Sequence, residues 1–146
     1  MDIISDITNI PVDRGSFDAI MCIEVFEHLP NPVKAIEEFG RIVKTGGKLI
    51  ITAPFCSFTH FAPFHFATGF NKYFYETHLK DNGFTIIEIT PNGNYFEFLA
   101  QELRRLRYVA KLYSKKNINV FDYILLFFLL NKLQRIEQSD SKSVVI

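Results

Sequence analysis

The first part of the chain contains two unbroken apolar runs, and between them lies a segment whose apolar residues recur at helical spacing. Residues 18–23 (DAIMCI) show no polar alternation, which is typical of a strand covered on both faces in a parallel sheet. Asn31-Pro32 supplies an N-cap and a first-turn proline for a helical repeat that we expect Thr45-Gly46-Gly47 to stop. Residues 48–53 (KLIITA) form a second apolar run. The order strand, helix, strand predicts a right-handed parallel crossover.

A second helix and a third strand are predicted after a long connection. Residues 71–82 have helical character and are followed by Gly83, which suits the end of a helix. Residues 84–90 (FTIIEIT) then indicate a strand. The alternation of strands and helices predicts an α/β fold, with a parallel sheet flanked by helices.

The last third of the chain is predicted to be helical. Asn94, with Glu97 three residues later, resembles a capping box at the start of a helix that runs to about residue 116. A second helix is expected over about residues 121–138, and the tail 139–146 suggests the start of a further strand. We expect one domain over residues 1–146, within which residues 95–138 form a helical C-terminal extension.

Composition excludes several classes of protein. The 146 residues are 48% hydrophobic and 22% charged, which excludes a disordered or fibrous chain. Sixteen basic residues balance sixteen acidic ones, so nothing in the net charge indicates nucleic acid as a partner. The two cysteines lack metal-ligand spacing, and the N-terminus carries acids where a signal peptide is basic. A cytoplasmic protein with free thiols is predicted.

Three stretches, in this order and spacing, resemble the C-terminal part of a class I S-adenosylmethionine-dependent methyltransferase of the type 11-like group. They are DITNIP (residues 6–11), SFDAIMCIEVFEHLPNP (16–32) and EEFGRIVKTGGKLIITAPF (37–55). The resemblance covers about residues 1–94 and implies a partial Rossmann-like fold with extra C-terminal helices. It also implies that S-adenosylmethionine lies across the carboxyl ends of the early strands.

The resemblance assigns roles to residues near those strand ends. Asp6 and Ile7 would hold the adenine, whereas Ile23 and Glu24 would face the methionine part and the methyl group. Glu24 and His28 are the implied catalytic residues. The family's Gly-rich turn does not occur in this chain, because none of the seven glycines forms G-x-G. The chain therefore resembles a truncated domain that begins at the family's third strand.

The missing neighbouring strand has a physical consequence. The resemblance implies that one edge of the strand at residues 18–23 lacks its partner, and an open apolar edge invites pairing with another chain. We expect another chain, as in a homo-oligomer such as a dimer, or the rearranged N-terminal segment to cover this edge.

Glu24, Glu27 and His28 are candidate ligands of a divalent cation such as magnesium, manganese or zinc. Some members of the family that methylate catechol-type hydroxyls hold a cation with a Glu-x-x-Glu-His group, which lowers the pKa of the acceptor. A second interpretation stays open, in which Glu27 and His28 are polar residues of the turn before the helix. Oxygen and nitrogen ligands do not select among these metals.

The loop over residues 56–70 is rich in phenylalanine and contains two candidate substrate-side residues, His60 and His65. Either histidine could act as a general base if the loop folds over the site, and some of the phenylalanines could line an apolar acceptor pocket. The alternative is that the histidines cap local backbone. Asn94 is a third candidate for the substrate side, although its capping role also explains it.

Two functions from different classes fit the sequence. The first is methyl transfer from S-adenosylmethionine to a small-molecule or glycan acceptor, incomplete in this chain. The second is a non-catalytic module that dimerises through its open sheet edge and apolar helices. The basic stretch at residues 104–116 is either a solvated helix face or a contact with phosphate, glycan or an anionic membrane surface.

Overall fold

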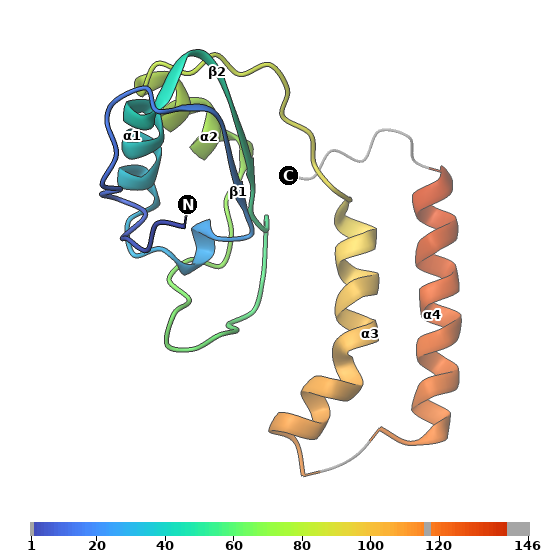
Figure 1. Ribbon diagram of the computed structural model, residues 1–146. Helices are drawn as coiled ribbons and strands as arrows, with labels where there is room; N and C mark the ends of the chain where they lie inside the picture. Colours follow the sequence, from blue (N-terminus) through green and yellow to red (C-terminus); the bar gives the residue numbers. More distant parts are fainter. Residues whose placement is uncertain (1, 116–117, 140–146) are drawn as a thin grey trace. The chain divides into compact units, whose positions relative to one another are not determined.

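The computed structural model describes residues 2–115 and 118–139, which form two compact units divided between Ile89 and Thr90. The division lies close to the predicted start of the helical extension, and a single domain over both units stays a prediction. The first unit contains β1 (Phe17–Ile23), a short 3-10 helix η1 (Phe26–His28), α1 (Pro32–Ile42), β2 (Val43–Thr52) and α2 (Lys72–Asp81). The second contains α3 (Tyr95–Tyr113) and α4 (Val120–Ser139) (Figure 1).

The two strands of the first unit pair in parallel, as the strand-helix-strand order predicts. Cys22 lies opposite Ile51 in the register. Figure 1 shows α1 and α2 on the same side of the strand pair, where the buried Cys22 contributes to the core. Met21 is 71% exposed on the opposite face. The expectation of a strand covered on both faces is therefore wrong within this unit, because its helices cover one face only.

The junction between α1 and β2 differs from the expected glycine stop. Helix α1 begins as predicted, with Asn31 Oδ1 accepting from the Lys34 amide at 3.1 Å, but it ends at Ile42 and the chain enters β2 directly. The register shifts opposite Asp18, and a Cβ on Gly47 would lie 2.8 Å from the Asp18 carbonyl oxygen. The glycine pair therefore permits an irregularity inside β2 and does not cap the helix.

The core of the first unit is built around Phe26 in η1, whose side chain is fully buried. Its ring lies 6.3 Å from the ring of Phe39 in α1, and edge-on at 6.0 Å from Phe70 and 6.4 Å from Phe74. Ala35, Ile36 and Cys22 complete the buried cluster. Because aromatic burial dominates core energetics, Phe26 fixes η1 to the rest of the unit.

A carboxylate and a guanidinium attach the N-terminal segment to α1. Glu38 Oε1 accepts from the Ile10 amide at 2.7 Å and pairs with Arg41 Nη2 at 2.7 Å. Arg41 also donates to the carbonyls of Ile10 at 2.8 Å and Val12 at 2.7 Å. These bonds fix the path of the segment that contains Asp6 and Ile7.

The helix α2 agrees with its prediction, whereas the third strand does not form. Asn71 caps α2 through bonds to the amides of Tyr73 and Phe74, and Gly83 follows the helix with φ +81°. Residues 84–90 are not part of a strand. A strand requires a ladder of hydrogen bonds with a neighbour, and β2 pairs only with β1 among the described residues.

The second unit is a helical hairpin. The capping box predicted at the start of α3 is present, because Asn94 accepts from the Phe96 and Glu97 amides and the Glu97 side chain accepts from the Asn94 amide. Helices α3 and α4 pack against each other. No helix in the described part of the chain has the length and apolar character needed to cross a membrane. The sequence suggests a strand for the tail 139–146, of which Ser139 is the last residue of α4 and residues 140–146 lie outside the described residues.

Candidate functional site

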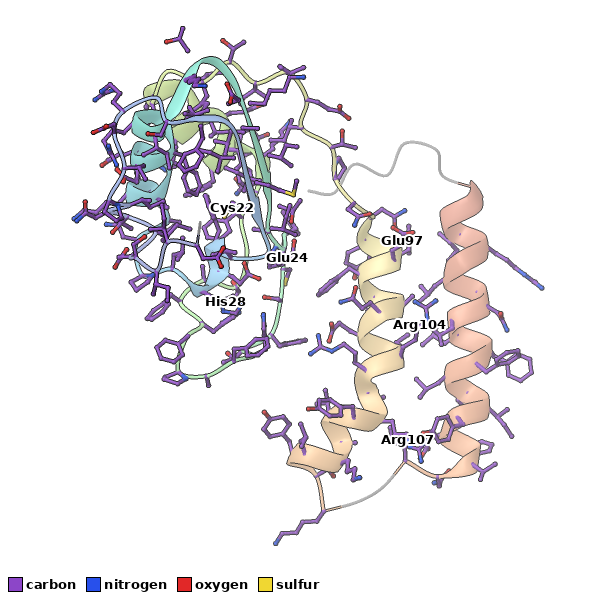
Figure 2. The ribbon with its side chains drawn as sticks, viewed as in Figure 1. Cys22, Glu24, His28, Glu97, Arg104 and Arg107 are labelled. Carbon is purple, nitrogen blue, oxygen red and sulfur yellow. The ribbon has the colours of Figure 1, made fainter. Side chains whose placement is uncertain are left out.

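The chain leaves β1 through a strained residue, Glu24. Its φ of +51° is a left-handed conformation that residues other than glycine adopt at a cost, and such strain is concentrated at functional sites. The Glu24 amide donates to the Thr52 carbonyl at 2.9 Å, and the Thr52 hydroxyl donates to Glu24 Oε1 at 2.8 Å. Figure 2 shows Glu24 just after β1, with His28 on the short helix that follows. The sharp turn brings η1 to the carboxyl end of the sheet.

Glu27 is a buried carboxylate in this turn. Its residue is 1% exposed, and its Oε2 atom has no hydrogen-bond partner in the part of the chain that the structure describes. An unpaired buried carboxylate costs several kcal/mol, so a native structure retains one where a cation or a proton compensates it. The buried carboxylate of Glu27 therefore marks the centre of the candidate site.

Two histidine rings present their Nε2 atoms to this carboxylate. His28 Nδ1 lies 2.5 Å from the Phe64 carbonyl oxygen, and His60 Nδ1 lies 2.9 Å from the Phe58 carbonyl oxygen. A carbonyl oxygen only accepts, so Nδ1 carries the hydrogen in both rings and Nε2 is unprotonated in the neutral form. The Nε2 atoms of His28 and His60 lie 3.6 and 4.0 Å from Glu27 Oε1.

The resulting group of Glu27, His28 and His60 has the composition of a metal site. One ligand atom from each residue lies within 4.8 Å of the others. Imidazole rings whose Nδ1 atoms donate to backbone carbonyls are held in the orientation that metal-binding histidines use. Glu24, which we expected among the ligands, is not part of this group, and its Oε1 accepts from the Thr52 hydroxyl.

The phenylalanine-rich loop folds back onto η1, and this brings His60 to the site. The amides of Phe66 and Ala67 donate to the Glu27 carbonyl at 2.8 and 3.2 Å, so the loop is tied to the same residue that carries the buried carboxylate. His65 lies with its ring 4.7 Å from that of His60, and its Nε2 is 3.2 Å from Ser57 Oγ. The loop therefore places both histidines beside His28.

The phenylalanines of this loop divide into two groups. Phe70 packs against the core, whereas the other four rings keep more than half of their surface exposed. Those four are Phe58, Phe61, Phe64 and Phe66. A closed acceptor pocket lined by these rings stays a prediction.

Tyr75 of α2 and Cys22 of β1 border the site and were not expected from the sequence. Burial, together with the nearby carboxylates of Glu24 and Glu27, raises the pKa of Tyr75 to about 12. Burial and the charge of Glu27 raise the pKa of the Cys22 thiol to about 11. Tyr75 lies in an ordinary helical repeat, so no sequence signal separates it from a core residue.

The remaining predicted residues occupy varied positions. Asp6 is exposed, and its Oδ1 accepts from the amide and the hydroxyl of Thr8 at 2.8 and 2.7 Å, which lowers its pKa. Ile7 packs against the core, and Ile23 is partly exposed at the end of β1. Asn94 belongs to the second unit, where it caps α3, and its expected role at the substrate stays a prediction.

Comparison with known proteins gives matches to methyltransferases. Residues 2–51 match the family model of a methyltransferase domain. A segment of 38 residues is 47% identical to the ubiquinone biosynthesis O-methyltransferase of Xanthomonas oryzae pv. oryzae, over 26% of this chain and 16% of that protein. A segment of 49 residues is 43% identical to an uncharacterised protein of Methanocaldococcus jannaschii, over 34% of this chain and 21% of that protein. These matches span at most about a fifth of either relative.

The fold has a counterpart among solved structures. Phosphoethanolamine N-methyltransferase 2 of Haemonchus contortus, solved in complex with S-adenosyl-L-methionine, superposes with a TM-score of 0.50 at 21% identity. The superposition covers 90% of this chain and 33% of that chain. At this identity the likeness establishes the fold, a partial Rossmann-like arrangement of parallel strands and helices.

Proposed function

We propose that this chain, whose residues 2–51 are part of a class I methyltransferase-like domain, takes part in methyl transfer from S-adenosylmethionine to a small-molecule or glycan acceptor. The main support is the convergence of Glu27, His28 and His60 just beyond the carboxyl end of β1. In open parallel sheets, ligands bind outside the carboxyl ends of the strands. The strained turn at Glu24 leads to Glu27 and His28, and the loop after β2 brings His60 beside them.

The cofactor would be held by residues at that sheet end. Ile23 and Glu24 face the methionine part in this proposal, and Asp6 accepts from the adenine amino group beside Ile7. Both hydrogen bonds from Thr8 to Asp6 use Oδ1, so Oδ2 is available for this contact. The family's G-x-G turn does not occur in these residues, so in this proposal the chain supplies only part of the cofactor site.

Methyl transfer from a sulfonium is an in-line displacement. A lone pair of the acceptor attacks the methyl carbon, and the carbon–sulfur bond breaks with its electron pair remaining on sulfur. A hydroxyl acceptor loses a proton in the process, which requires a base within hydrogen-bond reach. In their neutral forms His28 and His60 would offer Nε2 for this role, because Nδ1 of each ring donates to a backbone carbonyl. His65 lies beside both rings and would face the acceptor in this proposal.

In an alternative arrangement, Glu27, His28 and His60 would hold a divalent cation such as magnesium or zinc, and the Nε2 atoms would then be ligands and not bases. The fit rests on the unpartnered Oε2 of Glu27 and on the two Nε2 atoms beside its carboxylate. When bound, such an ion would lower the pKa of an acceptor hydroxyl. Glu24 lies outside this group of three, so in this proposal it contacts the cofactor or substrate.

The alternative function is an interaction module. Among the described residues β1 pairs with β2 only, and Met21 and Ile23 are exposed on the uncovered face of the sheet. A second copy of the chain, or another protein, would pair with the open edge of β1. Light scattering on the purified chain would give twice the monomer mass if it forms the predicted dimer. We place both functions in the cytoplasm.

Calorimetric titration with S-adenosylmethionine and S-adenosylhomocysteine tests the enzymatic proposal. We expect binding that Glu24→Ala weakens, whereas Glu37→Ala, which removes an exposed carboxylate on α1, leaves it unchanged. The absence of heat and of thermal stabilisation at millimolar ligand would contradict cofactor binding by this chain and favour the interaction module.

Thermal unfolding with and without metal tests cation binding independently of cofactor binding. The unfolding temperature should rise with magnesium or zinc, and Glu27→Gln should abolish the rise. Because Glu27→Gln replaces a carboxylate whose buried Oε2 has no partner among the described residues, the metal-free variant should be at least as stable as the parent. Destabilisation of the metal-free variant, with the metal effect retained, would support the alternative of a polar turn residue.

A further inference from the structure

The α3–α4 hairpin carries a stripe of exposed cations that the proposed reaction does not use. Arg104, Arg107 and Lys111 are exposed and follow one another at spacings of three or four residues, which places them on one face of α3, and the exposed Lys115 follows the end of the helix. The sequence from Leu103 to Phe121 contains no acid. Of the basic residues in this stretch, only Arg105 has a carboxylate partner among the described residues, Glu102 at 2.8 Å. The stripe is a site of concentrated positive charge.

The first half of α4 adds an exposed apolar surface, the outer patch. It consists of Phe121, Ile124, Leu125 and Phe128, which are 66%, 48%, 54% and 65% exposed. Their spacing of i, i+3, i+4 and i+7 places them on one face of the helix. Tyr123, Leu126 and Leu130 lie on the opposite face and line a groove shared with α3. The outer patch is therefore not used to hold the hairpin together.

The two features occupy the same end of the hairpin. The cations lie in the second half of α3, and the outer patch lies in the first half of α4, directly after the connection between the helices (Figure 1). Arg104 and Arg107 line the groove between the helices, where the Arg107 guanidinium lies 5.6 Å from the ring centroid of Tyr123. Figure 2 places Arg104 and Arg107 on α3, one turn apart.

We propose that this end of the hairpin docks onto an anionic lipid bilayer, an interaction that goes beyond the proposed methyl transfer. Exposed apolar rings and exposed cations at one end of the hairpin match the two layers of a membrane surface, in which acyl chains lie below negatively charged headgroups. Tyr108 and Tyr113 are exposed close to the cations, and tyrosine suits the boundary between these layers. The positive charge favours a bilayer over a second copy of the chain as the partner, because a symmetric contact at this end would bring like charges together.

Cosedimentation of the full chain with lipid vesicles tests the proposal. We expect the chain to bind vesicles of phosphatidylcholine mixed with phosphatidylserine, to bind pure phosphatidylcholine far more weakly, and to be released by high salt. The double variant Lys111→Glu, Lys115→Glu should reduce binding by at least about 25-fold, because each cation near an anionic surface contributes about fivefold. Lys34→Glu, which reverses an exposed charge in the first unit, should bind like the parent.

A second variant isolates the apolar contribution. Phe121→Ser with Phe128→Ser removes two exposed rings and should weaken vesicle binding without lowering the helical circular dichroism signal. Equal binding to neutral and anionic vesicles, or unchanged binding by both double variants, would overturn the proposal. A vesicle-independent dimer that the phenylalanine variant dissociates would also overturn it and would assign the outer patch to a second copy.

Discussion

Glu27 Oε1 lies 4.0 Å from Nε2 of His60, although the two residues belong to different segments of the first unit. Glu27 is in η1, directly after β1, whereas His60 is in the loop that follows β2. The backbone of that loop is hydrogen-bonded to the Glu27 carbonyl, so the contact depends on the path of the loop. The candidate site is therefore formed by two turns at one end of the sheet.

Replacement of Phe26 should destabilise the first unit strongly. Its side chain is fully buried among the rings of Phe39, Phe70 and Phe74, and truncation of a buried phenylalanine costs about 3–5 kcal/mol. Phe26→Ala should lower the free energy of unfolding by this amount in urea denaturation. Phe58→Ala removes an exposed ring and should change it by less than about 0.5 kcal/mol. Similar effects of the two variants would contradict the assigned core.

The ion pair of Glu38 and Arg41 should make stability depend on acid pH. The Arg41 guanidinium lowers the pKa of Glu38 below its ordinary value of 4.5. A lowered pKa in the folded state means that the contribution is complete above pH 4.5 and is lost as the pH falls through the folded value.

Urea titrations of the parent and of Glu38→Gln at several pH values check this dependence. The difference between their free energies of unfolding should be largest near neutral pH and should shrink as the pH falls through the lowered folded pKa of Glu38, below which the carboxyl is protonated in both states. A difference that grows on acidification would show that folding does not lower the pKa of Glu38.

The two cysteines should react at very different rates. Cys22 is buried in β1, and burial raises its thiol pKa to about 11, whereas Cys56 is exposed. Only the thiolate attacks disulfide reagents, so one thiol should react in the folded chain and two in denaturant. Cys56→Ser should remove the rapid phase. Rapid reaction of that variant would show that β1 is not protected as the structure indicates.

Loss of the Asn94 side chain should weaken the start of α3. Asn94 accepts from two amides of the first turn, and replacement of such a cap by alanine costs about 1 kcal/mol. Asn94→Ala should therefore lower the stability of the hairpin, measured by thermal circular dichroism, while Asn94→Asp should preserve it. An equal loss in both variants would favour a role for Asn94 other than capping.

Much of the fold was predictable from the sequence because the signals are local. The apolar run of β1, the Asn31-Pro32 start of α1, the Asn71 cap of α2 and the capping box of α3 each depend on neighbouring residues only. Such signals favour a helix or a strand without any contact to residues distant in the sequence. The parallel pairing of β1 with β2 follows from their order and from the helix between them.

The predictions that were wrong share one physical cause, which is that they depend on contacts between residues distant in the sequence. Residues 84–90 have the composition of a strand, but a strand forms only where a neighbour supplies its hydrogen bonds. The Gly46-Gly47 pair has the composition of a helix stop, but it lies within β2. Gly47 is needed there because it closely approaches the backbone of Asp18 and leaves no room for a side chain.

The sequence by itself determined the α/β arrangement and the resemblance to methyltransferases, and it singled out Glu24, Glu27, His28, His60 and His65 as candidate residues. Only the tertiary structure decided that His60 joins Glu27 and His28 while Glu24 binds Thr52. The reason is geometric. Spacing along the chain specifies which residues share an element, whereas the loop contacts to η1 decide which side chains from different elements converge.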